Sequence, residues 1–181
     1  MRQTDGFSVV ELMMVMILAV ILMAMAIPAL SVNDRVRVDT AAREIQQELH
    51  AARLRAVGTN RRLEVRLNCP SAGQYRVVEA GWPDSGRCDP VTYPYPAPPD
   101  AAYRVPAKPR LDGPIRYLNN RVSLSSSSGT LVFQFLSNGQ AMKGSGGSAA
   151  PIALGGETLT LSIGSYSRRV NVNGLGKVLL Q

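Results

Sequence analysis

The feature that most constrains this chain is an uninterrupted apolar stretch close to its N-terminus. Residues 12–30 contain no charged or hydroxyl side chain, and residues 7–30 contain a single charge, Glu11. A helix that rises 1.5 Å per residue needs about 20 apolar residues to cross a bilayer core about 30 Å thick. Since no other part of the 181-residue sequence is comparably apolar, we expect one membrane-spanning helix over residues 7–30.

Two simple interpretations of this stretch leave its single charge unexplained. A secretory signal peptide has an apolar region of about 7–15 residues followed by an A-x-A-like site, and residues 24–26 (AMA) match such a site. The apolar region before it is longer than that, however, and it contains Glu11. A generic single-span anchor fits the length, but a carboxylate in a membrane segment costs about 2.5–3.5 kcal/mol and marks a functional residue by default.

The residues around Glu11 have the spacing of a processing site. Gly6 precedes Phe7, Glu11 is the fifth residue counted from Phe7, and Pro28 is the twenty-second. This segment, MRQTDG-FSVVEL, resembles the class III signal peptide of type IV prepilins and type II secretion pseudopilins. The resemblance implies a leader over residues 1–6, which prepilin peptidase cleaves between Gly6 and Phe7, and N-methylation of Phe7. It also implies a single-pass inner-membrane protein with a cytoplasmic N-terminus.

Glu11 and Pro28 are the residues that the resemblance assigns to assembly. After cleavage, the amine of Phe7 is a cation one helical turn from the Glu11 carboxylate. In a filament the amine of one subunit can pair with Glu11 of a neighbour, which lowers the cost of burying both charges; in a lone helix the same pair can form internally. Pro28 occupies the position where pilins commonly carry a helix-bending proline.

The helix is predicted to continue beyond the apolar stretch as an amphipathic extension over residues 31–58. Apolar residues recur there at steps of three and four, which places them on one helix face. They are Val38, Ala41, Ala42, Ile45, Leu49, Ala52 and Ala56. We expect this stripe to pack on the following domain. A coiled coil is the alternative, although the alanine-rich stripe extends over only about two and a half heptads.

Residues 59–181 alternate between short strand patterns and turns. Alternating apolar and polar side chains over Leu63–Leu67 predict a strand buried on one face, and Glu157–Ile163 with Tyr166–Val172 predict a hairpin. Further candidate strands are residues 75–80, 115–118, 121–124, 130–136 and 177–180. Together with the helix, these patterns predict an α+β fold in which a long N-terminal helix packs on an antiparallel β-sheet domain. The resemblance to type IV prepilins implies that this fold is pilin-like and that the domain is periplasmic or extracellular.

Two further segments are predicted to be loops. Residues 90–109 hold seven of the twelve prolines, which excludes a regular helix or a central strand. A ligand for a proline-binding domain is a weaker alternative for this segment. Residues 143–150 are rich in glycine and serine and are expected to form a flexible loop.

The sequence after the helix narrows the resemblance to the GspH/FimT family of minor pilins and pseudopilins. Members carry a similar Leu-x-x-Ala-Arg-x-x-Ala pattern, which residues 49–56 match here, and a Phe-x-x-x-Gly pattern, which residues 135–139 match. The family's terminal Gly-Arg-Val-Arg is replaced by residues 176–179 (GKVL). The resemblance implies a minor subunit of a type II secretion pseudopilus or a type IV pilus. Its implied partners are other pilin subunits, prepilin peptidase, the inner-membrane assembly platform and the lipid bilayer. A major pilin is a less favoured alternative.

The net charge of +7 suggests a second role. Residues 1–100 are neutral overall, so the whole excess lies in residues 101–181 and can attract polyanions such as DNA or acidic lipid headgroups. The candidate DNA-binding residues are Arg168, Arg169 and Lys177. Complementarity to acidic neighbours in a filament, or a merely soluble surface, explains the same charge. The replaced terminal arginines and the absence of an aromatic ladder weaken the DNA interpretation.

The two cysteines and the single histidine complete the candidate chemistry. In an extracytoplasmic domain Cys69 and Cys88 are expected to form a disulfide, and two free thiols are the alternative. His50 lies within the predicted helix without a second histidine or a free cysteine that could complete a metal site. No nucleophile–histidine–carboxylate set and no phosphate loop is evident. We therefore expect neither an enzyme nor a bound cofactor or metal.

Overall fold

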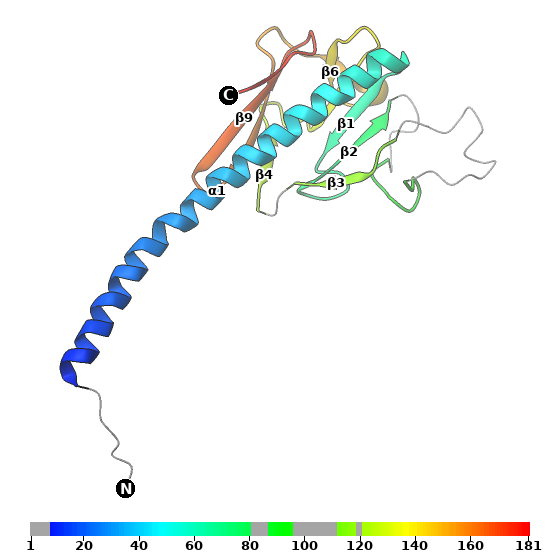
Figure 1. The fold of residues 1–181 in the computed structure, drawn as a ribbon. Helices are drawn as coiled ribbons and strands as arrows, with labels where there is room; N and C mark the ends of the chain where they lie inside the picture. The colour runs from blue at the N-terminus through cyan, green and yellow to red at the C-terminus, as the bar shows by residue number, and fades with distance from the viewer. Residues whose placement is uncertain (1–7, 81–86, 96–111, 119–120) are drawn as a thin grey trace.

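The computed structural model describes residues 8–80, 87–95, 112–118 and 121–181, and it describes only the backbone of residues 24–32. One long helix, α1 (Val9–Thr59), leads into a domain of strands. The N-terminal half of α1 projects away from the strands, whereas its C-terminal half lies across them (Figure 1). The predicted α+β class with one continuous helix is therefore confirmed.

The strands form two antiparallel sheets. The larger sheet has the order β3-β2-β1-β5-β6-β7, and the smaller sheet has the order β10-β9-β8-β4. The larger sheet consists of β1 (Leu63–Leu67), β2 (Gln74–Glu79), β3 (Ile115–Tyr117), β5 (Val132–Phe135), β6 (Ala141–Lys143) and β7 (Ala150–Pro151). The smaller sheet consists of β4 (Ser123–Ser126), β8 (Glu157–Ile163), β9 (Tyr166–Val172) and β10 (Val178–Leu180). A short 3₁₀ helix, η1 (Gly146–Ser148), lies between β6 and β7.

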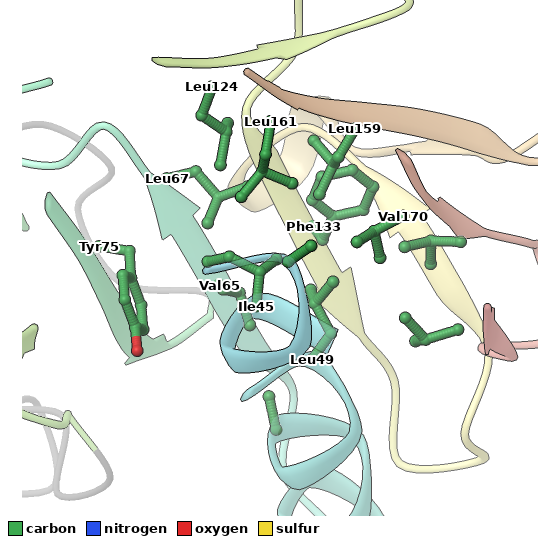
Figure 2. Close-up of a cluster of buried hydrophobic side chains, with 14 of the residues drawn as sticks. Ile45, Leu49, Val65, Leu67, Tyr75, Leu124, Phe133, Leu159, Leu161 and Val170 are labelled. Atoms are coloured by element: carbon green, nitrogen blue, oxygen red, sulfur yellow. The ribbon is translucent and has the colours of Figure 1, made fainter. Parts of the chain in front are cut away.

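The predicted helix stripe is the element on which both sheets pack. All seven of its residues are at most 1% exposed, and α1 contacts β1 and β5 of the larger sheet and β8, β9 and β10 of the smaller sheet. Figure 2 shows Ile45 and Leu49 among side chains of both sheets, including Phe133 and Leu159. Burial of each large aliphatic side chain contributes about 1.5–3 kcal/mol, so the helix closes a core that neither sheet closes alone.

Two predictions about the strand region are wrong. The strand Leu63–Leu67 is buried on both faces rather than one, because Glu64 is 1% exposed and Arg66 is 9% exposed. Residues 143–150 do not form a single flexible loop, since they contain the end of β6, η1 and the start of β7. The two corrections are connected, because Gly146 donates its N–H to the Glu64 carboxylate at 2.8 Å and so lies against the second face of β1.

The predicted proline-rich loop, residues 90–109, lies outside the described residues except for residues 90–95. The two short strands predicted around residues 119–120 are present as β3 and β4. They belong to different sheets, so the chain crosses from one sheet to the other between them.

Candidate assembly surface

The projecting part of α1 exposes an almost entirely apolar surface. Thirteen large hydrophobic side chains between Val9 and Met23 are each 48–77% exposed. Glu11 is the one charged residue among them, and it is also exposed. Monomeric soluble proteins rarely expose a contiguous apolar patch larger than a few hundred Å². This surface is therefore suited to contact another apolar surface.

The predicted processing site lies outside the described residues, since Gly6 and Phe7 precede the first of them. Glu11 lies in the first turn of α1, where the helix dipole favours a negative charge. The helix continues through the position of Pro28, whose side chain is outside the described set. None of the helices in the described part of the chain combines the length and hydrophobicity needed to cross a bilayer. The membrane-spanning role of residues 7–30 stays a prediction.

Polar contacts attach the second half of α1 to the larger sheet. The Tyr75 hydroxyl on β2 donates to Glu44 at 2.6 Å, and the Arg116 guanidinium on β3 donates to Glu48 at 2.6 Å. Burial raises the pKa of Tyr75, and the hydrogen bond to the Glu44 carboxylate raises it further. The phenol therefore stays protonated and remains a donor to the helix.

A second set of contacts attaches α1 to the smaller sheet. Asp39 pairs with Arg43 on its own helix at 2.9 Å and with Arg168 on β9 at 3.2 Å. The hydrogen bond from Arg43 is the main cause that lowers the pKa of Asp39. One turn before Asp39, the Arg35 guanidinium lies over the ring of Tyr166, 4.6 Å from its centroid.

Arg53 connects the last turns of α1 to turns of both sheets. Its Nε donates to the Gly139 carbonyl at 3.0 Å, in the turn between β5 and β6, and its Nη2 donates to the Leu175 carbonyl at 3.1 Å, in the turn between β9 and β10. Gly139 and Gly176 both have positive φ, at 84° and 75°, a conformation that glycine adopts at no steric cost.

The three segments that carry the family resemblance meet at this arginine. Arg53 comes from the Leu-x-x-Ala-Arg-x-x-Ala segment, Gly139 from the Phe-x-x-x-Gly segment and Gly176 from the terminal segment. The other matching residues are buried in the same core: Leu49, Ala52, Ala56 and Phe135. The convergence gives the separate matches one physical function, which is to fix the helix against both sheets.

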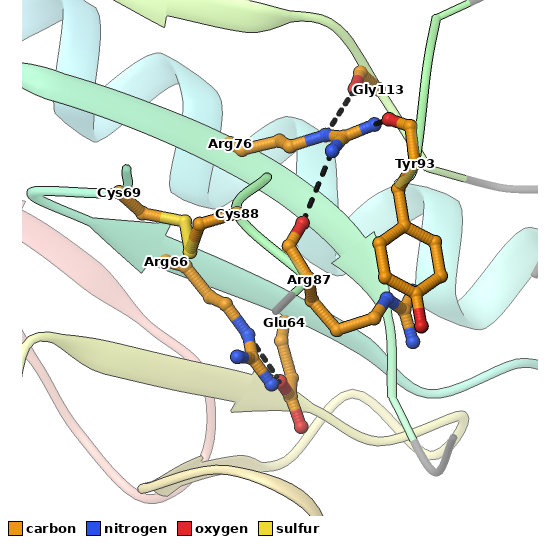
Figure 3. The surroundings of a disulfide bond; sticks show 8 residues. All are labelled: Glu64, Arg66, Cys69, Arg76, Arg87, Cys88, Tyr93 and Gly113. Carbon is orange, nitrogen blue, oxygen red and sulfur yellow. Dashed lines mark hydrogen bonds and ion pairs between the residues drawn. A yellow bond between two sulfur atoms is a disulfide. The ribbon is translucent and has the colours of Figure 1, made fainter. Parts of the chain in front are cut away.

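The Cys69–Cys88 disulfide is formed, with Cα atoms 5.3 Å apart. Beside it, the buried Arg76 guanidinium donates to three carbonyls, those of Gly113, Arg87 and Tyr93, at 2.8, 3.1 and 2.7 Å (Figure 3). Burial lowers the pKa of Arg76 from its ordinary value. The disulfide and this arginine thus hold residues 87–95 against β2.

A buried carboxylate organises the serine run that follows β4. Glu157, 4% exposed, accepts hydrogen bonds from the hydroxyls of Ser126 and Ser127 and from the N–H of Ser128, at 3.1, 2.7 and 2.7 Å. Burial alone would raise the pKa of Glu157, but these bonds outweigh it and lower the pKa to about 2. The serine run is therefore a structural turn built on a fixed negative charge.

The three candidate DNA-binding residues do not all lie on one face of the smaller sheet. Successive side chains of a strand point to opposite faces, so Arg168 lies on the α1 side of β9, where it pairs with Asp39, and Arg169 lies on the other side. Lys177 is exposed in the turn that precedes β10.

The described residues contain no group of three or more His, Cys, Asp or Glu side chains that could hold a metal. His50 is half-buried in α1.

Comparisons with known proteins agree with this architecture. The family model described as type II transport protein GspH matches residues 41–176. The type IV minor pilin FimU of Pseudomonas aeruginosa has a TM-score of 0.51 and 15% identity, covering 81% of this chain and 90% of FimU. The minor pseudopilin EpsH of the Vibrio cholerae Type 2 Secretion System has a TM-score of 0.47 and 12% identity, covering 80% of this chain and 96% of EpsH. No curated protein matches significantly in sequence.

The two kinds of similarity support different statements. At 15% identity, the likeness to FimU shows a shared fold, which confirms the predicted pilin-like architecture. The family match extends over most of the chain, from the buried stripe of α1 to Gly176 beside Arg53. This chain therefore belongs to the GspH family of type II transport proteins.

Proposed function

We propose that this chain is a minor pilin or pseudopilin, a structural subunit rather than an enzyme, that assembles into a type II secretion pseudopilus or a type IV pilus. Its family membership supports this role. The observation that supports it most directly is the apolar half of α1, which the described domain leaves exposed. Such a surface is stable when it lies in a bilayer before assembly and among the helices of other subunits afterwards.

The proposal divides the chain into four functional segments. Residues 1–6 are the leader that prepilin peptidase removes, and residues 7–30 are the helix that spans the inner membrane and then enters the filament core. Residues 31–58 join this helix to the domain, and residues 59–181 form the domain on the periplasmic or extracellular side. The assembly platform of the inner membrane would transfer the processed subunit to the filament.

Within the filament, the Glu11 carboxylate would form an ion pair with the methylated amine of Phe7 from an adjacent subunit. A buried carboxylate is tolerated when a cation pairs with it, and Glu11 is exposed in the isolated chain and available for such a pair. This contact would set the axial register between neighbours.

The test is to follow processing and assembly in cells that contain the matching prepilin peptidase. The mature chain should begin at Phe7 with a methylated amine when its intact mass and N-terminal peptide are measured. Glu11→Ala should be processed and yet be absent from sheared filaments, whereas the matched control Asp34→Ala should assemble. A mature chain that retains residues 1–6, or normal assembly of Glu11→Ala, would refute the proposal.

The type of filament is decided by the phenotype of a deletion strain. A pseudopilus subunit predicts loss of protein secretion, and a pilus subunit predicts loss of pili and of DNA uptake. Complementation with the full-length gene should restore the lost function, and complementation with Glu11→Ala should not.

DNA binding is the second candidate function, and it rests on the concentration of the net charge in residues 101–181. It predicts salt-sensitive retardation of DNA by the full chain in detergent. Reversal of Arg169 and Lys177, both exposed, should abolish the shift. Arg168→Glu should be analysed separately because this change also breaks the Asp39 pair. The absence of a shift at low salt would exclude this function.

A further inference from the structure

The end of the domain farthest from the N-terminus combines exposed apolar side chains with positive charge. We define this distal end by four segments, residues 53–62, 137–140, 153–155 and 173–177. The contacts of Arg53 join the first, second and fourth segments. The third lies beside the fourth, since a Cβ on Gly174 would lie 2.9 Å from the Ile152 carbonyl oxygen.

Three exposed apolar residues lie at this end, and we call them the distal patch. Leu54, Val57 and Leu175 are 70%, 48% and 71% exposed. The Leu175 carbonyl accepts a hydrogen bond from Arg53, and Val57 Cγ2 lies 3.5 Å from the position of a Cβ on Gly139. The three residues come from two parts of the chain 118 or more positions apart, and the half-buried Arg53 connects these parts.

The backbone beneath the patch is fixed rather than adaptable. Arg53 holds the turns of both sheets, and Gly176 packs against the Gly139 carbonyl with no room for a side chain. A preorganised surface loses little conformational entropy when it binds. Single exposed leucines are common on protein surfaces. Several exposed apolar residues on a fixed backbone, however, resemble the apolar centre of a protein–protein interface.

The charges around the patch indicate the chemistry of its partner. The four segments contain five cations and no aspartate or glutamate: Arg53, Arg55, Arg61, Arg62 and Lys177. From outside the segments, Glu79 pairs with Arg61 at 2.8 Å. The distal end thus carries a positive rim, which favours an acidic partner and disfavours a second basic surface.

We propose that the distal patch is a docking site for a partly apolar, acidic surface of a neighbouring protein subunit in the filament, an inference that rests on the proposed function. Leu54 and Leu175 would enter the apolar part of that surface, and the rim, including the exposed Arg62 and Lys177, would face its carboxylates. A nucleic acid would need the cations but not the exposed leucines, so a protein surface fits this end better.

The test uses the full chain in its native cells, with the photocrosslinking residue p-benzoylphenylalanine placed at Leu54 or Leu175. Val91, which is 86% exposed and lies three residues after Cys88, is the matched control position. Irradiation should give one adduct from Leu54 and Leu175 and none of that size from Val91. Peptide mass spectrometry should identify the partner as a pilin-like subunit joined near acidic residues.

Charge reversal tests the rim separately from the apolar centre. Arg62→Glu combined with Lys177→Glu should lower the adduct yield on the order of tenfold, which corresponds to about 1.4 kcal/mol. Arg169→Glu, an exposed charge reversal outside the patch, should leave the yield unchanged. Formation of the Cys69–Cys88 disulfide on non-reducing gels verifies that each variant is folded.

Several results would overturn the docking site. These are equal adducts from Val91 and Leu54, an adduct with DNA or lipid instead of protein, or a yield that is insensitive to the double reversal. The N-terminus of the chain is measured in the same cells. If the chain is processed after Gly6 and no adduct forms, the docking site alone fails, whereas retention of residues 1–6 contradicts the proposed function itself.

Discussion

Arg53 occupies the space that a side chain at Gly176 would need. A Cβ placed on Gly176 would lie 2.7 Å from Arg53 Nε and closer still to the Gly139 carbonyl oxygen. Because Gly176 has no side chain, the guanidinium can reach the turns of both sheets. The two residues are 123 positions apart, and each constrains what the other can be.

Gly176→Ala should therefore destabilise the domain more than an ordinary glycine substitution at positive φ. Gly129 is the matched control, since its φ is 77° and nothing lies within 4 Å of an added Cβ. Gly129→Ala should cost about 1–2 kcal/mol for the left-handed backbone, and Gly176→Ala about 1–3 kcal/mol more for the overlap. Urea unfolding of the full chain in detergent, followed by circular dichroism, measures both. Equal losses would show that Arg53 can move aside.

Arg53→Lys should weaken the attachment of α1 to the sheets although the charge is kept. An ammonium lacks the planar fork that reaches two carbonyls at once, and loss of hydrogen bonds from a charged donor costs about 1.5–3 kcal/mol. Arg43→Lys, which affects only the exposed pair with Asp39, should change the free energy of unfolding by less than about 0.5 kcal/mol. The same urea measurement distinguishes the two variants, and similar small effects would contradict the role of Arg53.

The Glu157 turn should make the domain sensitive to acid. The pKa of Glu157 is lowered in the folded chain to about 2 from its ordinary 4.5, so its contribution is complete above pH 4.5 and is lost as the pH falls toward 2. The loss should approach about 3 kcal/mol.

Variants of the neighbouring serines isolate this effect from other carboxylates. Ser127→Ala removes a donor to Glu157 and should flatten the decline of the free energy of unfolding between pH 4.5 and 2. Ser125→Ala, at an exposed position of β4, should follow the wild type. If both variants and the wild type decline in parallel, Glu157 is not responsible for the acid sensitivity.

Three attachments hold residues 87–95: the disulfide, the contacts of Arg76 and the ion pair between Arg87 and Asp112. Protection from protease should be lost when the first two are removed together. The disulfide closes a segment with a sequence separation of 19 and is worth about 3 kcal/mol, but Arg76 separately holds the Arg87 and Tyr93 carbonyls. Limited trypsin digestion should therefore cleave after Arg87 slowly in Cys69→Ser/Cys88→Ser and in Arg76→Met. The triple variant should be cleaved rapidly. Rapid cleavage in the disulfide-free variant alone would show that Arg76 does not hold this segment.

Local periodicity was sufficient to predict the helix and most strands. Spacing by three and four identified all seven buried residues of the α1 stripe, and spacing by two identified the β8–β9 hairpin. These patterns repeat within one element, so each element displays its buried face in its own sequence. The Cys69–Cys88 disulfide was also predicted, because the sequence contains only two cysteines.

Contacts between distant segments could not be predicted in this way. Glu64 and Arg66 have the alternating pattern of a solvent-facing strand side, yet both are buried, and Gly146 donates to Glu64. Nothing near Glu64 in sequence indicates that Gly146 donates to it. Likewise, the segments that contain Arg53, Gly139 and Gly176 were each recognised by resemblance, but their meeting point depends on how both sheets pack around α1.

The attachment of α1 along two sheets has a mechanical consequence. The polar contacts that α1 makes with the two sheets extend from Asp39 to Arg53, along the packed half of the helix and on both of its sides. A pulling force along the projecting half would load these contacts in shear, all at once, instead of peeling them apart one by one. Separation of the domain from the helix would then require all of these contacts to break together. Arg53, the contact farthest from the projecting half, would be the last point of attachment along the helix.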